Sequence, residues 1–368
     1  MPLGEWGNWR ARVVLAHEDQ VRILAPLPFG AMDATPFKGR VRARIERDRS
    51  ALVDLSHRIH ANPELMYQER LSSGWCADML ESAGYDVTRG AAGLETAIVA
   101  TYGAGPLNLA LLIEYDALPD VGHACGHNII AASSVGAALA LTEVAEELGL
   151  RITAIGSPAE EGGAGKVELI DAGAFEGVHA ALMVHPGPSD VAAPEVLAAQ
   201  TLEVTYTGRA AHAGGYPERG INAADAMVVA QVAIALLRQA LLASDRVHGI
   251  VTRGGEASNI IPARVEGQWM VRAATAARLA EVKTKVRRCF EAGALATGGE
   301  MEIIERPLYS DMIHDAELVR LYEANAVALG RSFAKESAFN RFSTDMGNVS
   351  YVVPSIHPVI EIQANGAS

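Results

Sequence analysis

The chain has 368 residues, 49% hydrophobic and 20% charged, which is ordinary for a globular protein and long enough for two domains. Its 31 basic and 44 acidic residues give a formal net charge of −13, which argues against nucleic-acid and membrane-surface partners. Three widely spaced cysteines (Cys76, Cys125 and Cys289) do not suggest a disulfide framework, so we expect a reduced, cytoplasmic protein.

The first elements expected along the chain are helices. Residues 1–40 show no sustained periodicity, and we expect them to form an atypical N-terminal extension. From residue 41, apolar side chains recur every three to four positions and predict a helix that breaks at Asn62-Pro63. A second helix is expected from Ser72 to Ser82, before Gly84.

Strands and helices then alternate. This pattern predicts an α/β catalytic domain over residues 41–195, with a mostly parallel sheet covered by helices on both faces. The strand candidates are residues 96–102, 107–113, 151–157 and 180–184, and the helix candidates are residues 129–148 and 166–172. In such sheets, ligand sites lie beyond the carboxyl ends of the strands.

The pattern changes near Val196, and residues 196–306 predict an inserted α+β domain with two helices on a small sheet. Its expected strands are residues 201–207, 247–252, 264–273 and 301–305, and its helices are residues 221–243 and 278–294. The apolar stretch 223–243 contains Asp225, Gln231 and Arg238, so we expect a buried helix rather than a membrane span. Residues 307–368 return to the catalytic domain through a helix at 315–329 and a strand at 351–353.

The segment from Glu114 to Asn128 holds carboxylates, imidazoles and a thiol directly after a buried strand. Such groups are costly to hold together unless something binds them. Asp116, His123, Cys125 and His127 are of the residue types that ligate zinc-like cations, so a metal ion is the simplest explanation. The alternative is a polar loop with one buried thiol.

Two further candidates also follow strands. Neighbouring side chains in extended backbone point in opposite directions, so one of Glu160 and Glu161 can bind a metal while the other takes a proton from a metal-bound water. His185 follows a third strand and is a candidate ligand. The alternatives are two surface glutamates and a histidine satisfied within a core or loop.

Three residues of the inserted domain are candidates for contact with substrate. His212 could polarise the scissile carbonyl when the domains close. Asn259 and Arg272 could fix a substrate carboxylate, although Arg272 could equally be an exposed strand arginine. The chain lacks a Gly-x-Ser-x-Gly elbow and a P-loop, so serine-hydrolase and phosphoryl-transfer functions have no support.

These motifs, in their order, resemble the aminoacylase/carboxypeptidase-type metallopeptidases of family M20, on the amidohydrolase branch with a cysteine ligand. The likeness runs from about residue 41 to about residue 362. The segments Ser343–Ser350 and Pro354–Pro358 further resemble the β-alanyl-lysine dipeptidase and p-aminobenzoyl-glutamate hydrolase subfamily. The matching motifs are His57–His60, Pro63–Leu65, Asp116–Pro119, Gly122–Asn128, Ser157–Glu161, His185-Pro186, Ala211-His212 and Asn259–Pro262.

The resemblance implies a site for two divalent metal ions, zinc or manganese. The implied ligands are Cys125, His127, Glu161 and His185, Glu160 is the general base, and His123 and Asp116 orient the ligands. It also implies a homodimer formed through the inserted domain, with His212 serving the partner's active site. The expected function is hydrolysis, by metal-activated water, of an amide between an acyl or aminoacyl group and an amino acid with a free carboxylate.

One departure from the family concerns the end of the chain. The family carries a last metal-ligand histidine beyond the Ile-His-Pro segment, whereas no histidine follows His357 and the chain stops at Ser368. We therefore expect residues 307–368 to be a truncated part of the catalytic domain, or one metal position to be lost. This leaves two alternatives: a non-catalytic binding or regulatory relative, and a metal-free thiol enzyme that uses Cys125.

Overall fold

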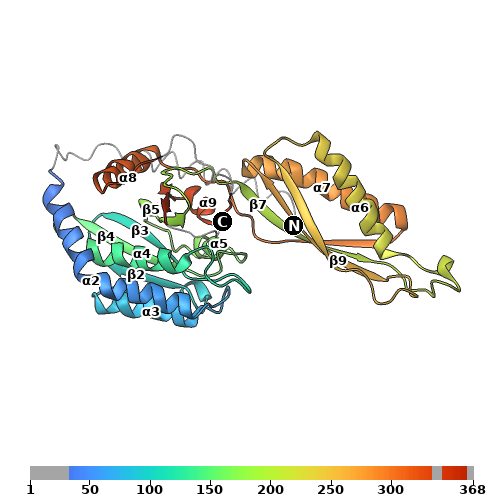
Figure 1. Ribbon diagram of the computed structural model, residues 1–368, viewed down its shortest axis with the longest axis horizontal. Coiled ribbons are helices and arrows are strands. Elements are labelled where there is room, and N and C mark those ends of the chain that lie inside the picture. The colour runs from blue at the N-terminus through green and yellow to red at the C-terminus, as the bar shows by residue number, and fades with distance from the viewer. Residues whose placement is uncertain (1–32, 334–341, 363–368) are drawn as a thin grey trace. The chain divides into compact units, whose positions relative to one another are not determined.

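A computed structural model describes residues 33–333 and 342–362 (Figure 1). The chain divides into two units, the first comprising Met1–Glu195 and Met312–Ser368 and the second Val196–Asp311. Most of the expected N-terminal extension lies outside the described residues. The expected extension, residues 1–40, ends earlier than predicted, because helix α2 (Thr35–Ala61) already begins at Thr35. Pro36 stands in the first turn of α2, where its fixed φ is favourable and its missing N–H is not needed.

Within the described residues, the first unit contains a six-stranded sheet in the order β1-β2-β4-β3-β5-β11. Strand β3 is parallel to β4 and β5, and β11 is parallel to β5, whereas β1 and β2 form an antiparallel edge. The predicted mostly parallel sheet is therefore confirmed. The strands are β1 Asp86–Arg89, β2 Ile98–Tyr102, β3 Leu107–Glu114, β4 Leu150–Ser157, β5 Ala180–Leu182 and β11 Ser355–Ile356.

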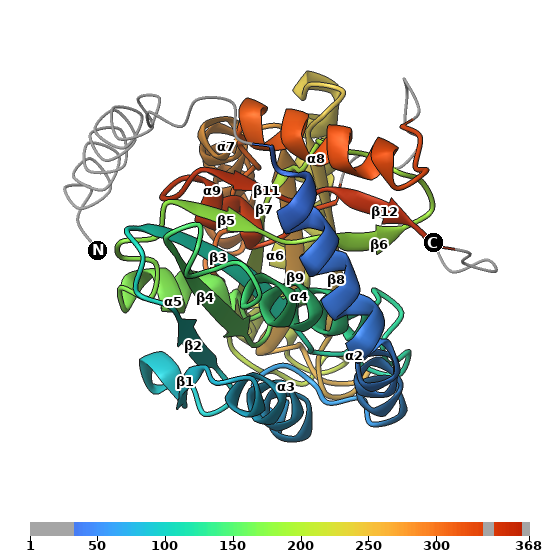
Figure 2. The ribbon, with the colours of Figure 1, turned by 90° about the vertical axis from the view of Figure 1, so that its left-hand side faces the viewer.

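Helices cover both faces of this sheet, as predicted. Leu111 and Ile113 of β3 join a core with α2, α3 and α4, whereas Ala110 and Leu112 join a second core with α5 and α9. Figure 2 shows α2, α3 and α4 gathered along the same side of the sheet. The remaining elements of this unit are α3 Arg70–Ser82, α4 His127–Leu141, α5 Gly165–Asp171, α8 Ala316–Ala328, α9 Met346–Ser350, η1 Ala91–Gly93 and the parallel pair β6 His185–Gly187 and β12 Val359–Glu361.

Two expected elements of the first unit are corrected. Residues 351–353 form a turn after α9 rather than a strand, because the amide of Val353 donates locally to the carbonyl of Val349 (2.9 Å). The helix expected to reach residue 148 ends at Leu141. Beyond it the chain continues in tight turns, such as the bond from the Val144 amide to the Leu141 carbonyl (3.1 Å).

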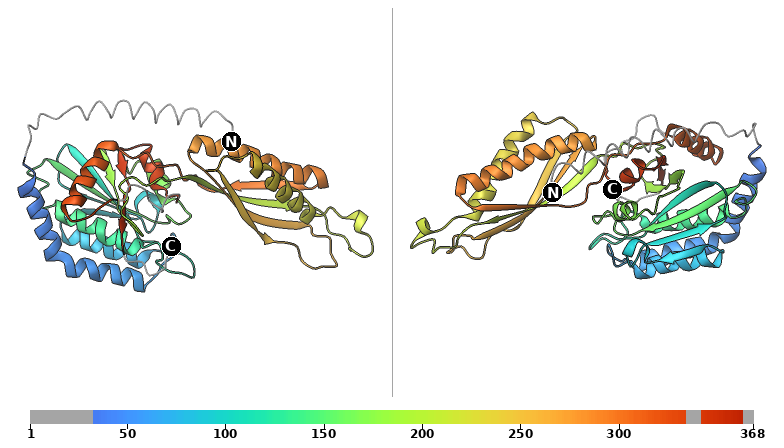
Figure 3. Two further views of the ribbon diagram at one scale, coloured as in Figure 1. Left: turned by 45° about the horizontal axis from the view of Figure 1, so that its top comes forward. Right: turned by 180° about the vertical axis from the view of Figure 1, so that it is seen from behind.

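The second unit is a four-stranded antiparallel sheet in the order β10-β7-β9-β8, with α6 and α7 on one face (Figure 3). It ends five residues after the expected boundary at 306, because Tyr309 and Ala199 exchange two backbone hydrogen bonds of 2.9 Å. The elements are β7 Ala198–Thr207, η2 Pro217–Arg219, α6 Ala223–Leu237, η3 Arg238–Ala240, β8 Arg246–Arg253, β9 Arg264–Ala273, α7 Ala276–Thr297 and β10 Glu300–Glu305.

The apolar helix of this unit is not buried as expected. The stretch Ala223–Ala240 is long and apolar enough to cross a membrane, judged by length and composition alone. Core helices of water-soluble proteins also meet these two criteria. In this structure 28% of the stretch is buried. Ala226, Ala230 and Ile234 pack into the core of the unit, whereas the opposite face stays exposed although it is apolar. The α-helix is also shorter than expected and ends at Leu237.

Candidate functional site

The register of two parallel strands sets the position of the candidate site. Glu114 at the end of β3 is paired with Ser157 at the end of β4. The two segments that follow these strands, residues 115–126 and 158–164, therefore begin at the same edge of the sheet. This is the edge at which ligands bind in parallel α/β sheets.

Helix α4 begins at His127, and the turn before it requires a glycine. Gly126 has a φ of 77°, and a Cβ there would lie 2.5 Å from Cγ of Pro186. This close approach brings the segment of His185 next to the start of α4. The rings of His127 and His185 lie 6.1 Å apart between centroids and are nearly perpendicular.

Asp116 fixes two of the predicted metal ligands. Its Oδ1 lies 2.9 Å from Nδ1 of His127, and its Oδ2 accepts a 2.9 Å hydrogen bond from the amide of Glu161. Burial opposes ionisation of Asp116, but the neighbouring His127 holds the pKa of this carboxyl below its usual range. Burial opposes a charge on His127 as well, but Asp116 outweighs it and raises the pKa of His127 to about 10. Asp116 therefore orients the ring of His127 and holds the backbone of Glu161.

The other ring nitrogen of His127 faces a group of carboxylates. Nε2 lies 3.6 Å from Glu114, 3.8 Å from Glu160 and 3.7 Å from Glu161. Ligand atoms of His127, Glu160 and Glu161 all lie within 4.8 Å of one another. Oε2 of Glu114 and Oε1 of Glu161 are buried and lack a hydrogen-bond partner among the described residues. Convergent carboxylate oxygens beside an imidazole nitrogen fit a divalent cation.

The glutamate pair follows a strained residue. Ala159 has a φ of 59°, which is rarely adopted by residues with a side chain. Its amide donates a 2.8 Å hydrogen bond to Oε1 of the buried Glu69, which also accepts from the amide of Tyr67 and the hydroxyl of Thr96. Sequence reasoning missed this role of Glu69, because a carboxylate ninety positions before Ala159 carries no local signal.

Cys125 is a half-buried free thiol beside Glu161. Burial and the hydrogen bond with Glu161 raise the pKa of Cys125 far above its ordinary value. Without a cation the residue is therefore a neutral thiol, which is a poor nucleophile. This weakens the alternative of a metal-free thiol enzyme.

The two remaining candidate histidines of this unit, His123 and His185, differ in their surroundings. Nδ1 of His185 lies 2.6 Å from the carbonyl oxygen of Pro186, which leaves its Nε2 available for a ligand. His123 is buried, with its ring centroid 6.4 Å from that of His60. Burial, together with the nearby His127, lowers the pKa of His123 to about 4. His123 is therefore a neutral neighbour of the cluster.

A buried lysine lies at the same sheet edge. Nζ of Lys166, at the start of α5, lies 2.5 Å from Oε1 of Glu114 and 2.5 Å from Oδ1 of Asp345. All three side chains are almost fully buried. Sequence reasoning assigned no role to any of the three. The available signals were the position of Glu114 at a strand end and a lysine directly after a glycine-rich loop.

The structure brings together two of the three candidates of the second unit, His212 and Asn259, but not Arg272. The His212 and Asn259 segments lie side by side, because the amide of Ala213 donates to the carbonyl of Asn259 (3.0 Å). Arg272 stands near the other end of β9, eight residues after Arg264, or about 26 Å along the strand. Among the described residues Arg272 has no carboxylate partner, and its Nε lies 3.2 Å from Sδ of Met270.

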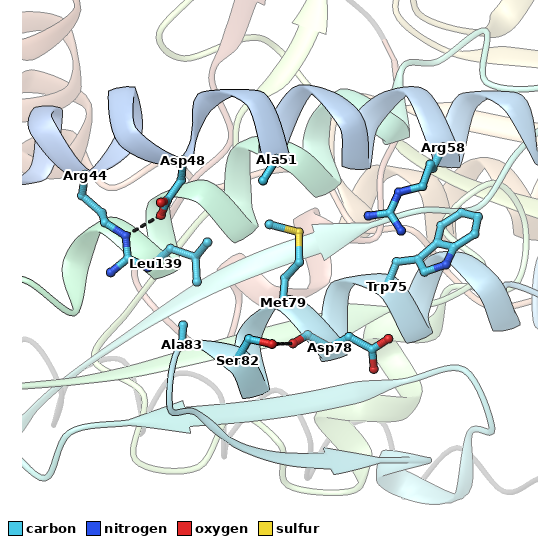
Figure 4. A pocket seen from close by; sticks show the side chains of 10 residues that line it. All are labelled: Arg44, Asp48, Ala51, Arg58, Trp75, Asp78, Met79, Ser82, Ala83 and Leu139. Atoms are coloured by element: carbon cyan, nitrogen blue, oxygen red, sulfur yellow. Dashed lines mark hydrogen bonds and ion pairs between the residues drawn. The ribbon is translucent and has the colours of Figure 1, made fainter.

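The first unit contains a pocket of about 290 Å³, and none of the predicted site residues lines it. This pocket lies between α2 and α3, where the guanidinium of Arg58 lies 5.0 Å from the ring centroid of Trp75 (Figure 4). Arg44 and Asp48 form an ion pair at its other end. It is a groove between packed helices, with its own charged groups already paired or stacked.

Comparison with known proteins gives consistent matches. The family model described as Peptidase family M20/M25/M40 matches residues 110–365. Xaa-Arg dipeptidase of Mus musculus is 40% identical over 343 residues, which cover 88% of this chain and 80% of the mouse protein. A subunit of the p-aminobenzoyl-glutamate hydrolase of Escherichia coli is 32% identical over 279 residues. That match covers 70% of this chain and 58% of the E. coli protein.

Solved structures show the same fold. An aminobenzoyl-glutamate utilization protein from Klebsiella pneumoniae superposes with a TM-score of 0.77 at 20% identity, covering 88% of this chain and 94% of that chain. A dinuclear metal-binding peptidase of the M20 family from Bacillus subtilis gives a TM-score of 0.65 at 22% identity and covers 86% and 89% of the two chains. The predicted α/β domain with an inserted α+β domain is thus confirmed as a fold.

Proposed function

Because the chain belongs to peptidase family M20/M25/M40, we propose that it is a metal-dependent amidohydrolase or dipeptidase. Family membership confirms the prediction of an enzyme of the peptidase and hydrolase class. The proposed substrate is an amide that joins an acyl or aminoacyl group to an amino acid with a free carboxylate. The names of the mouse and E. coli relatives, which contain arginine and p-aminobenzoyl-glutamate, support this substrate class.

The convergence of Glu160 and Glu161 on Nε2 of His127 is the observation that carries the proposal. A pair of divalent cations held there would polarise the amide carbonyl and lower the pKa of a water molecule. His127, Glu161, Cys125 and His185 are the proposed ligands. A thiolate and imidazoles favour zinc, whereas carboxylates favour manganese, so the proposal names both metals.

Glu160 is the proposed general base. Its carboxylate would accept a proton from the attacking water and return it to the nitrogen of the leaving amine. Burial, followed by the charges of Glu114 and Asp345, raises the pKa of Glu160 well above its ordinary value. A raised pKa suits a group that must hold a proton between these two transfers.

The second unit would supply the substrate contacts. We assign His212 to stabilisation of the oxyanion, and Asn259 and Arg272 to binding of the substrate carboxylate. Because Asn259 precedes the start of β9 and Arg272 lies near its end, a single copy of this unit cannot bring both to the same carboxylate. If both contact one substrate, they come from different subunits. This supports the proposal that His212 serves the active site of a partner.

A homodimer formed through the second unit is supported by an exposed apolar stripe on α6. Val228, Val232 and Leu236 are 55%, 55% and 71% exposed. Their spacing of four residues places them on the same face of the helix. Contiguous exposed apolar side chains mark interaction surfaces.

Cytoplasmic location and the absence of nucleic-acid and membrane partners remain predictions from composition and charge.

The direct test is metal content per chain, measured by elemental analysis on protein purified without chelator. Hydrolysis of β-alanyl-lysine and p-aminobenzoyl-glutamate would be followed in parallel, with and without chelator. Bound metal together with chelator-sensitive hydrolysis would support the proposal. No metal and no turnover, even after addition of zinc or manganese, would favour the non-catalytic binding or regulatory relative. Turnover that survives chelation but not alkylation would favour the thiol enzyme.

A further inference from the structure

A second group of acidic side chains shares Glu114 and Glu160 with the carboxylates that face His127 and adds Asp345. Oxygen atoms of Glu114, Glu160 and Asp345 all lie within 4.8 Å of one another, and all three residues are buried. Hard oxygen donors at this spacing suit a cation such as Mn²⁺ or Ca²⁺. Three carboxylates cannot remain ionised in a buried site without compensating positive charge.

The structure supplies that charge from the chain itself. Nζ of Lys166 lies 2.5 Å from Glu114 and 2.5 Å from Asp345, and Lys166 is fully buried. The backbone amide of Lys166 also donates a 3.0 Å hydrogen bond to the second oxygen of Asp345. Lys166 is therefore held through both its side chain and its backbone by a carboxylate 179 positions away in the sequence.

The lysine and the candidate metal centre share a carboxylate. Oε1 of Glu114 contacts Lys166, whereas its Oε2 lies 3.6 Å from Nε2 of His127 and has no hydrogen-bond partner among the described residues. One oxygen of this buried carboxylate is thus occupied by an ammonium, and the other is free and directed at the candidate ligand His127.

From this arrangement we propose that Lys166 acts as a built-in cation, which takes the place of a metal ion among Glu114, Glu160 and Asp345. Its ammonium pairs permanently with Glu114 and Asp345 and leaves cation binding to the side of Glu114 that faces His127. A neutral side chain at this position should therefore convert the three-carboxylate group into an additional cation site. The inference concerns cation binding alone and does not require that the chain hydrolyses any substrate.

The test compares Mn²⁺ binding by the full-length wild-type chain and by Lys166→Ala, which removes the charge and opens space for the ion. Equilibrium dialysis against Mn²⁺, with elemental analysis, gives the number of ions per chain. We expect Lys166→Ala to bind one more Mn²⁺ than the wild type under the same conditions. The double variant Lys166→Ala/Asp345→Asn, which loses a proposed oxygen ligand, should return to the wild-type number. Lys166→Arg keeps the charge and should also match the wild type.

Folding of Lys166→Ala provides a second readout, because the variant loses the ammonium that pairs with the buried carboxylates of Glu114 and Asp345. Its melting temperature should rise with Mn²⁺ at concentrations where the melting temperature of the wild type no longer changes. A folded Lys166→Ala chain with the wild-type number of ions would overturn the proposal. So would a variant that stays unfolded at high Mn²⁺ concentrations. Because the comparison is with the wild type, it holds whether the wild-type chain binds two ions or none, and it is separable from failure of the proposed hydrolase activity.

Discussion

Nδ1 of His127 lies 2.9 Å from Oδ1 of Asp116, and both side chains are buried. This pair fixes the imidazole so that its Nε2 faces Glu114, Glu160 and Glu161. The same Asp116 holds the backbone of Glu161 through its other oxygen. A buried carboxylate behind a histidine is a common way to orient a metal ligand, which is the proposed role of His127.

Replacement of Glu160 separates a general base from a ligand. We expect Glu160→Gln to lower turnover by roughly 10²–10⁴-fold, because the amide cannot accept a proton. Metal content should stay at the wild-type level, measured by elemental analysis of the same preparations. Glu161→Gln is the matched control and should lose metal. If Glu160→Gln loses metal instead, Glu160 is a ligand, which its 3.8 Å distance from Nε2 of His127 would also allow.

Replacement of Glu69 tests the support of the strained Ala159. In Glu69→Gln one acceptor oxygen becomes an NH₂ group, so the side chain can no longer accept all three of the hydrogen bonds that Glu69 receives from two amides and a hydroxyl. We expect a loss of about 1–3 kcal/mol in the free energy of unfolding, together with a lower kcat, because Glu160 is displaced.

The matched control for Glu69 is Glu64→Gln. Glu64 also accepts several hydrogen bonds, from the amides of Leu71 and Ser72 at the start of α3. Glu64→Gln should therefore lower the free energy of unfolding, but it should lower kcat less than Glu69→Gln does. Equal effects of the two variants on kcat, measured at matched stability, would mean that Glu69 has no special link to the glutamate pair.

His212 is predicted to act on the partner's site. His212→Ala should lower kcat by roughly 10²–10³-fold, as expected for loss of an oxyanion-stabilising group, with unchanged metal content. Co-expression of His212→Ala with Glu160→Gln distinguishes the two possible arrangements. In a mixed dimer, the His212→Ala subunit keeps Glu160 and receives His212 from its partner, so activity should return. No recovery in verified mixed dimers would place His212 in the site of its own chain.

The exposed face of α6 should determine the oligomeric state. Leu236→Glu places a charge in the apolar stripe, and we expect it to shift the protein from dimer to monomer in light-scattering measurements at a fixed concentration. Leu295→Glu on α7 is the control, because Leu295 is 87% exposed on another helix of the same unit. Dissociation by the control alone would move the interface to α7, and a wild-type monomer would exclude the proposed dimer.

The sequence predicted much of the fold through local periodicity. Strand β9 has the expected bounds, 264–273, and β3 and β4 differ from the predicted strands by a single residue each. Elements governed by local hydrogen bonds were predicted less well, such as the turn at 351–353. Periodicity reports which face of an element is apolar, but it does not report where short-range bonds end that element.

The sequence by itself determined which residues follow the strand ends, and hence the group of Asp116, Cys125, His127, Glu160 and Glu161. A parallel register is enough to bring such segments to one edge, because their strands are neighbours. Only the tertiary structure revealed the pairing of Lys166 with Asp345, the support of Ala159 by Glu69, and the separation of Asn259 from Arg272. These relationships join residues that lie far apart in the sequence, so local patterns do not place them relative to one another. A buried charge needs a partner only once folding has removed it from water, so the ionic pairs are decided by the tertiary structure.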